Sequence, residues 1–223
     1  MFDPEQIVFG VMWFVVFLFS TVCHEAAHAW AAMRGGDSTA YHHGQVSLSP
    51  FPHMRREPFG MLVMPWLTFF MNGWMMGWAS APYDPLWARR HPKRAAWMSL
   101  AGPVANFTLA IISGLAIRFG RSMGAFQPGE GLLATSGDAV LTLLGITFFL
   151  NLLLGTFNLL PLPPLDGFTA IGIILPESLA YKLEEFRQTA GMFQFVGLII
   201  AWQVGGYFFQ PVYRIASSIL LGG

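Results

Sequence analysis

A long apolar run near the start of the chain, Ile7 to Met33, is the feature that most constrains the fold. Its first part, Ile7 to Phe19, contains no charged residue. A helix needs roughly 20 apolar residues to cross the hydrocarbon core of a membrane. The run closes with a polar cluster and then Arg34, Gly35 and Gly36. Since a cation and glycine favour the end of a helix, we expect one membrane-spanning helix over this run.

Composition extends this expectation to the whole chain. Hydrophobic residues make up 54% of the 223 residues and charged residues only 11%, whereas a soluble domain carries about 25% charged residues. We therefore expect an integral, multi-pass membrane protein whose partner is the lipid bilayer, built as one membrane-embedded domain over residues 1–223. The formal net charge is zero, which gives no electrostatic basis for binding nucleic acid. The single cysteine, Cys23, excludes a zinc site made of cysteines.

Further apolar runs predict the other membrane helices. Ala95 to Arg118, Leu132 to Leu154 and Gly191 to Phe209 each read as a span, and Val212 to Leu221 either extends the last one or lies at the interface. Gly60 to Trp78 is ambiguous. Basic residues flank it on both sides, and a single crossing would place one of these flanks outside the cytoplasm. A re-entrant or shallow element is favoured for this run.

The stretch Tyr41 to Ser49 differs from these runs because apolar and polar residues alternate, as in Gln45-Val46-Ser47-Leu48-Ser49. A period of two predicts a short strand or hairpin. The expected fold is therefore an all-α polytopic membrane protein of about five to six transmembrane helices. A small membrane-associated β-hairpin or re-entrant segment is expected after the first helix.

The polar cluster of the first helix is His24-Glu25-Ala26-Ala27-His28. Residues four apart share one face of a helix, so His24 and His28 can share one metal ion. Glu25 stands beside them and can act as a base on water, as in zinc metalloproteases with the H-E-x-x-H pattern. The alternative is a polar patch that closes a transmembrane helix at the headgroup level.

A second polar stretch runs from Asn158 to Gly167 and contains three prolines, which prevent a regular helix. Asp166 lies in it among apolar residues, where an unpaired carboxylate costs about 2.5 to 3.5 kcal/mol. A metal cation would remove this cost, so Asp166 is the best candidate for a third ligand. The alternative is an aspartate that caps the next helix. Asn106 supplies a further polar group at depth, for an interhelical hydrogen bond or for substrate binding.

Taken together, these stretches resemble the site-2 protease family of intramembrane zinc metalloproteases, peptidase family M50. The matching motifs are His24 to His28, Ala-Gly-Pro-x-x-Asn from Ala101 to Asn106, and Asn-x-x-Pro followed by Leu-Asp-Gly from Asn158 to Gly167. The resemblance implies one Zn²⁺ ion held by His24, His28 and Asp166, with Glu25 as catalytic base. It also implies that Asn158 stabilises the oxyanion or positions substrate. No segment can hold a PDZ domain or a CBS pair, so a minimal member is expected.

The expected function is that of a zinc metalloendopeptidase. It would hydrolyse a peptide bond within or near the transmembrane segment of a membrane-protein substrate, as in regulated intramembrane proteolysis, with its active site toward the cytoplasmic side. The extended stretches Tyr41 to Ser49 and Gly77 to Tyr83 could pair with an unwound substrate. The alternative is a non-catalytic metal-binding membrane protein or a transporter. A transporter should show a polar path or paired broken helices in two halves, whereas this chain has one polar focus and no repeat.

Overall fold

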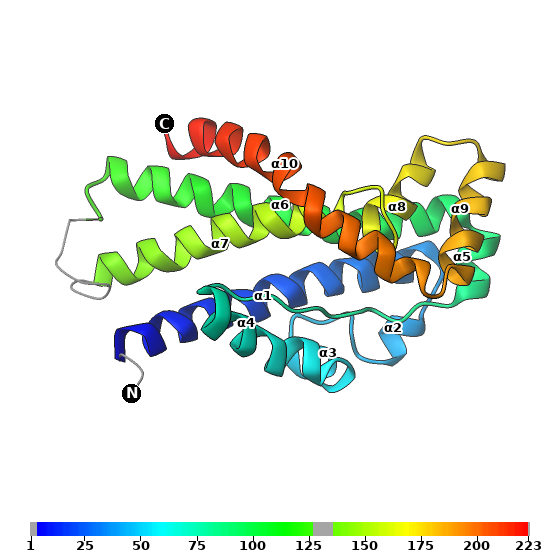
Figure 1. Cartoon of the computed structure of the whole chain (residues 1–223), viewed down its shortest axis with the longest axis horizontal. Coiled ribbons are helices and arrows are strands. Elements are labelled where there is room, and N and C mark those ends of the chain that lie inside the picture. Colours follow the sequence, from blue (N-terminus) through cyan, green and yellow to red (C-terminus); the bar gives the residue numbers. More distant parts are fainter. Residues whose placement is uncertain (1–3, 127–135, 223) are drawn as a thin grey trace.

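The structure is a computed structural model that describes residues 4–126 and 136–222. Within those residues, four helices are long and apolar enough to cross a membrane. They are α1 (Pro4–Gly35), α6 (Pro92–Ser122), α7 (Ser136–Asn158) and α10 (Phe193–Leu221). They run roughly along the long axis of the molecule, and both chain termini lie at the same end (Figure 1). The start of the predicted span Leu132 to Leu154 lies outside the described residues.

Shorter helices connect these four. They are α2 (Thr39–His42), α3 (Pro50–Arg56), the π-helical turn η1 (Phe59–Val63), α4 (Met64–Asn72), α5 (Pro85–Arg90), α8 (Asp166–Ala170), the 3-10 turn η2 (Ile171–Ile173) and α9 (Glu177–Thr189). Helix α6 is central, because it packs against α1, α7, α8 and α10. One apolar cluster joins α6, α7 and α10 around Ala110, Phe148 and Phe209. Another joins α1 and α7 around Phe17 and Leu150.

The prediction of a β-hairpin at Tyr41 to Ser49 is wrong. The described residues contain no strand, and this region holds α2 followed by turns. The Asp37 carboxylate accepts hydrogen bonds from the main-chain N–H and the hydroxyl of Thr39, at 2.9 and 2.6 Å, which form a turn just before α2. Main-chain bonds then close locally, as from Gln45 N–H to the Ala40 carbonyl. A strand needs a neighbouring strand for its main-chain groups, and none is at hand.

The number of spans is also lower than the predicted five to six. The apolar helix within Gly60 to Trp78 covers Phe59–Asn72, which at 1.5 Å per residue is about 21 Å long, shorter than the roughly 30 Å hydrocarbon core. It ends at Gly73, whose φ of +79° favours glycine. The last two apolar runs form one helix, because α10 continues through Pro211. These two differences bring the count to four.

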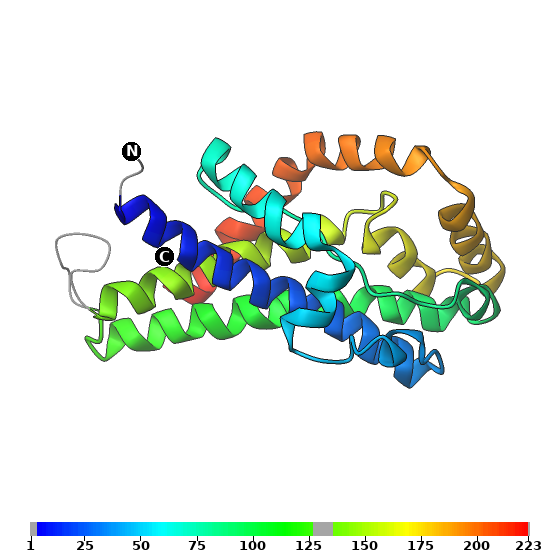
Figure 2. The ribbon, with the colours of Figure 1, turned by 90° about the horizontal axis from the view of Figure 1, so that it is seen from below.

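We call residues 59–84 the excursion segment. Its first arm, η1 and α4, runs along α1, and its second arm returns as extended chain to α5 (Figure 1). An out-and-back path of this kind is what a re-entrant segment would follow. Its two arms touch where the Trp78 N–H donates to the Gly60 carbonyl at 3.3 Å. A side chain at Gly77 would collide with that carbonyl. Helix α1 lies between this segment and the pair α6 and α7 (Figure 2).

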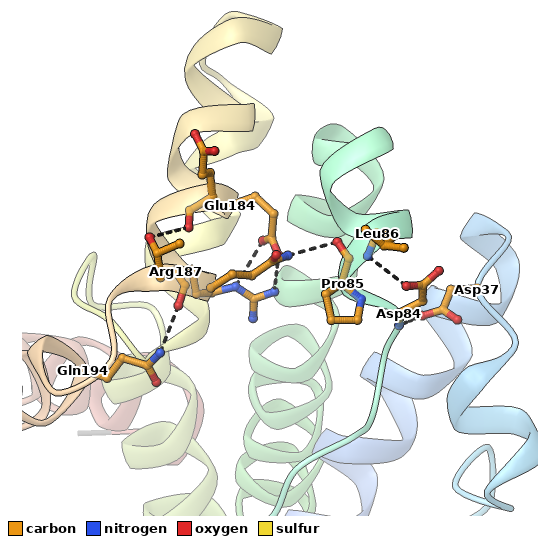
Figure 3. A network of polar contacts seen from close by, with 10 residues as sticks. Asp37, Asp84, Pro85, Leu86, Glu184, Arg187 and Gln194 are labelled. Carbon is orange, nitrogen blue, oxygen red and sulfur yellow. Dashed lines mark hydrogen bonds and ion pairs between the residues drawn. The ribbon is translucent and has the colours of Figure 1, made fainter.

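A polar network connects residues near α5 and α9 at the end of the molecule away from the chain termini (Figure 3). Asp37 accepts a hydrogen bond from the Asp84 N–H at 2.8 Å. On α9, Glu184 is 1% exposed and pairs with Arg187 at 2.9 Å. Burial would lower the pKa of Arg187, but the Glu184 carboxylate raises that pKa above its ordinary value. This pair lies within α9 itself, and the link from α9 to α5 is the hydrogen bond that Nε2 of Gln188 donates to the Pro85 carbonyl at 3.0 Å.

Candidate metal centre

The two histidines of the H-E-x-x-H pattern lie on the buried face of α1 that packs against α6. His24 is 7% exposed and His28 is 8% exposed. Their Nε2 atoms are 2.9 Å apart. The helix partner at this point is Gly102 of α6, where an added Cβ would lie 2.3 Å from Nε2 of His28 and 2.6 Å from Nε2 of His24. The absent side chain leaves a small space directly at the two nitrogens.

The other ring nitrogen of each histidine is bonded within the protein. Nδ1 of His28 lies 2.7 Å from the Met98 carbonyl oxygen, which can only accept, so Nδ1 carries the proton. Nδ1 of His24 lies 2.5 Å from Oδ1 of Asn106, which also accepts. In the neutral imidazoles both Nε2 atoms therefore present lone pairs to the space beside Gly102. Their 2.9 Å separation is not a hydrogen bond, because neither atom has a proton to donate.

Asp166 brings a third acceptor to the same point. Its Oδ2 lies 3.1 Å from Nε2 of His24 and 3.2 Å from Nε2 of His28. This oxygen is buried and makes no other hydrogen bond. Asp166 is the first residue of α8, and the N-cap position before it is taken by Leu165, whose side chain makes no cap bond. The carboxylate is therefore directed at the histidines rather than at its own helix.

The loop before Asp166 is fixed on both sides. Leu160 and Leu165 pack with Ala201 of α10 in a small apolar cluster. The Pro163 carbonyl lies so close to α10 that a side chain at Gly197 would collide with it. Beyond Asp166, the Lys93 ammonium of α6 donates to the carbonyls of Gly172, Ile173 and Leu175, at 2.9 Å for the first two. The position of the carboxylate is thus set by α6 and α10 together.

The three side chains fit a zinc ion. Their ligand atoms form a triangle with sides of 2.9, 3.1 and 3.2 Å. In tetrahedral coordination with bonds of 2.0 to 2.1 Å, two ligand atoms lie about 3.3 Å apart. Two imidazole nitrogens and one carboxylate oxygen, with one position left open, are a donor set of catalytic zinc. With both rings neutral, three lone pairs meet at this point, and a bound cation or a proton on one Nε2 would relieve their repulsion. Among the described residues, these three side chains form the group of histidines and carboxylates whose ligand atoms could hold one metal ion.

The remaining predicted residues lie around this centre. Glu25 is buried, at 6% exposure, and follows His24 on α1. Among the described residues its carboxylate has no hydrogen bond or ion pair. Asn158 ends α7, half buried, and its amide has no such partner either. Asn106 is fully buried and bonded on both sides, to His24 and to Asn151. Its amide has no free surface to offer a substrate.

Sequence reasoning did not single out three contributors to the centre. Gly102 provides the space, the Met98 carbonyl orients His28, and Asn151 holds Asn106. A signal was present for Gly102, because it lies in the Ala-Gly-Pro-x-x-Asn motif. The Met98 carbonyl has no side-chain signature. Asn151 is one polar residue in an apolar helix, which suggests an interhelical bond without naming its partner.

Comparison with known proteins agrees with this geometry. The sequence model described as Peptidase family M50 matches residues 120–202. The "Putative zinc metalloprotease YwhC" of Bacillus subtilis is 30% identical over 208 residues, which cover 93% of this chain and 88% of that protein. The chain belongs to peptidase family M50. This M50 peptidase is also 32% identical over 203 residues to the "Putative zinc metalloprotease Rip2" of Mycobacterium tuberculosis, covering 91% of the chain and 72% of Rip2.

Family membership confirms the resemblance to site-2 proteases that the sequence motifs predict. A third relative of this M50 peptidase, Rip2 of Mycolicibacterium smegmatis, is 29% identical over 196 residues. No solved structure gives a significant match. Together with the four apolar helices, the family makes this chain an integral membrane protein.

Proposed function

We propose that this M50 peptidase is an intramembrane zinc metalloprotease that cleaves a peptide bond within or near the transmembrane segment of a membrane-protein substrate. The observation that carries the proposal is the convergence of His24, His28 and Asp166 on one buried point, beside an unbonded carboxylate. The point lies between helices long enough to cross a membrane. Protein substrates that reach it would be membrane-embedded themselves.

The cofactor is zinc. The relatives YwhC and Rip2 are each named "Putative zinc metalloprotease", and the donor set of this chain fits the same ion. His24, His28 and Asp166 would hold it. When bound, zinc supplies a Lewis acid that polarises the scissile carbonyl and lowers the pKa of a water molecule toward about 7.

Glu25 is proposed as the general base. It accepts the proton of the attacking water and then passes this proton to the leaving amine. Two observations support this role: Glu25 follows His24 on the same helix, and within the described residues its carboxylate makes no hydrogen bond or ion pair. Asn158 is proposed to donate its amide N–H to the carbonyl oxygen as negative charge develops there. That role follows the family motif, and its amide is unbonded at the end of α7.

The substrate must unwind before it reacts, because a helix holds its carbonyls in internal hydrogen bonds. We propose that the extended return arm of the excursion segment, near residues 77–83, offers main-chain groups to the unwound strand. The centre is proposed to face the cytoplasm. Cations at the end where α1 stops support this orientation under the positive-inside tendency. They are Arg34, Arg89, Arg90, Lys93, Arg94, Lys182 and Arg187.

The test compares purified wild type with Glu25→Gln and Asp166→Ala on a panel of single-span substrates in proteoliposomes. Zinc content is measured in parallel. Glu25→Gln is expected to keep its zinc and to lose about 10²- to 10⁴-fold in cleavage rate. Asp166→Ala is expected to lose zinc and activity. Glu185→Gln, an exposed carboxylate of α9, serves as the matched control and is expected to behave as wild type.

Two outcomes would contradict the proposal. Full cleavage by Glu25→Gln would exclude the base. Full zinc occupancy in Asp166→Ala would exclude the third ligand. A wild type that binds zinc tightly and cleaves no membrane substrate would favour the alternative of a non-catalytic metal-binding membrane protein.

A further inference from the structure

We propose that Asn151 of α7 is a positioning residue that determines which nitrogen of His24 binds the metal. It would act through Asn106, without touching the metal or the substrate. The inference rests on the zinc site proposed above and extends it to a residue of another helix. Asn151 and Asn106 are both fully buried, so neither amide can turn toward solvent.

The chain of hydrogen bonds has a fixed direction because it starts at a main-chain carbonyl. The Asn151 side chain lies 2.9 Å from the carbonyl oxygen of Thr147 and 2.8 Å from the hydroxyl of Ser20. A carbonyl oxygen only accepts, so the amide nitrogen of Asn151 must face it. Its amide oxygen must then point the other way, toward Asn106.

This orientation passes to the next residue. The Asn106 amide nitrogen donates to Oδ1 of Asn151 at 2.8 Å. The Asn106 oxygen is therefore turned toward Nδ1 of His24, 2.5 Å away. Because an amide oxygen only accepts, Nδ1 of His24 carries the proton and Nε2 keeps its lone pair for the metal.

Without Asn151, no hydrogen bond would fix the orientation of the Asn106 amide. The Asn106 amide could then rotate by half a turn and present its nitrogen to His24. Nδ1 would have to accept, and the ring proton would move to Nε2, where it excludes a metal. His28 is not subject to this exchange, since its Nδ1 faces the Met98 main-chain carbonyl, which cannot turn. The dependence on Asn151 is thus specific to His24.

A purely structural role is the competing explanation, because Asn151 also links α7 to α1 and α6. A double-mutant cycle separates the two. Asn106→Asp replaces the amide by a carboxylate, both of whose oxygens accept, so the orientation of this group no longer matters. This variant also loses the donor to Oδ1 of Asn151, so its own zinc affinity is the reference for the second substitution. If Asn151 acts by orienting Asn106, its removal has little effect in the Asn106→Asp background. If it only links helices, its removal costs the same in both backgrounds.

The experiment measures zinc affinity of the full chain in detergent by competition with a chelator, without any cleavage assay. Asn151→Leu is expected to weaken zinc binding about 10- to 100-fold. Asn106→Asp/Asn151→Leu is expected to match Asn106→Asp within about 3-fold. In Ser20→Ala, the Thr147 carbonyl still fixes the orientation of the Asn151 amide. The zinc affinity of this variant is expected to stay near that of wild type.

Asn151→Asp covers the case in which Asn151→Leu does not fold. Its carboxylate still accepts from Asn106 and can accept from the Ser20 hydroxyl, while its contact with the Thr147 carbonyl becomes repulsive. Lower stability but a zinc affinity close to wild type is therefore expected in the folded protein. The proposal is overturned by wild-type affinity in folded Asn151→Leu, by an equal loss in both backgrounds, or by a loss in folded Asn151→Asp as large as that in Asn151→Leu. Failure of the zinc site itself looks different: wild type would then bind no zinc, or His24→Ala would bind as tightly as wild type.

Discussion

Gly102 lies where α6 crosses the two imidazole rings of α1, and the size of this one residue sets the room for the ion. An added Cβ would lie within 2.6 Å of both Nε2 atoms. Real Cβ atoms essentially never approach so closely, and the rings cannot retreat because both Nδ1 atoms are bonded. A single methyl group at this position therefore competes with the metal for the same space.

Gly102→Ala is accordingly expected to lower zinc affinity by more than about 10-fold, although alanine is the better helix former. Zinc content of the purified protein checks this. Gly145→Ala on α7 is the matched control, because an added Cβ meets no atom within 4 Å there. That variant is expected to keep its zinc. Full zinc content in Gly102→Ala would show that the ion does not occupy this space.

Among the elements, α8 and η2 form a short helical unit that carries Asp166 and cannot hold its place alone. Its last carbonyls are exposed at the helix end, where a cation is favourable. Lys93 of α6 supplies that cation by donating to Gly172, Ile173 and Leu175. The third ligand is thus tied to α6 through the far end of its own helix.

Replacing this ammonium should loosen the unit. Lys93→Met is expected to lower stability by about 2 kcal/mol, the range for hydrogen bonds to charged groups. Amide hydrogen exchange over residues 166–173 should become faster. Thermal unfolding in detergent and exchange mass spectrometry measure the two effects. Lys182→Met on the exposed face of α9 is the control, and an equal loss in that variant would contradict the role of Lys93.

At the level of the elements, part of the fold and of the site could be predicted from the sequence. His24 and His28 could be paired because helix geometry places residues four apart on one face, and the long apolar runs predicted the four spans. The hairpin predicted at Tyr41 to Ser49 was wrong because a period of two describes only the alternation of side chains. It does not show which partners the main-chain N–H and C=O groups have. The hydrogen bonds from Thr39 to the Asp37 carboxylate favour a turn and a short helix there. The link from Asn151 to His24 joins three helices, and spacing along one helix does not reveal which neighbour it faces.

At the scale of the whole molecule, the four candidate spans of the described residues are an even number, so we expect both termini on one side of the membrane. The cationic end of α1, α5 and α9 lies at the opposite end of the molecule from the termini (Figure 1). The opposite end carries Arg118 and Arg121 at the close of α6. The larger group of cations is expected in the cytoplasm, so the termini are expected outside it.

Cysteine labelling tests this orientation in the full chain. In a Cys23→Ala background, Ser122→Cys reports the end near the termini and Glu185→Cys reports α9. Both positions are exposed. A membrane-impermeant maleimide is expected to label Ser122→Cys in spheroplasts and Glu185→Cys only in inverted vesicles. The reverse pattern would place the metal centre toward the outside.

The polar network of Figure 3 has a consequence for how this end of the molecule can evolve. Several of its contacts join a side chain to a main-chain atom: Asp37 to the Asp84 N–H, Gln188 to the Pro85 carbonyl, and Gln194 to the Arg187 carbonyl. A main-chain partner stays the same whichever side chain it bears. These contacts to positions 84 and 85 therefore need no compensating change when the side chains there vary, and the side chain of Asp84 is constrained instead by the α5 cap that it makes with the Leu86 N–H. Covariation between alignment columns would leave these contacts unseen, even where every relative keeps them.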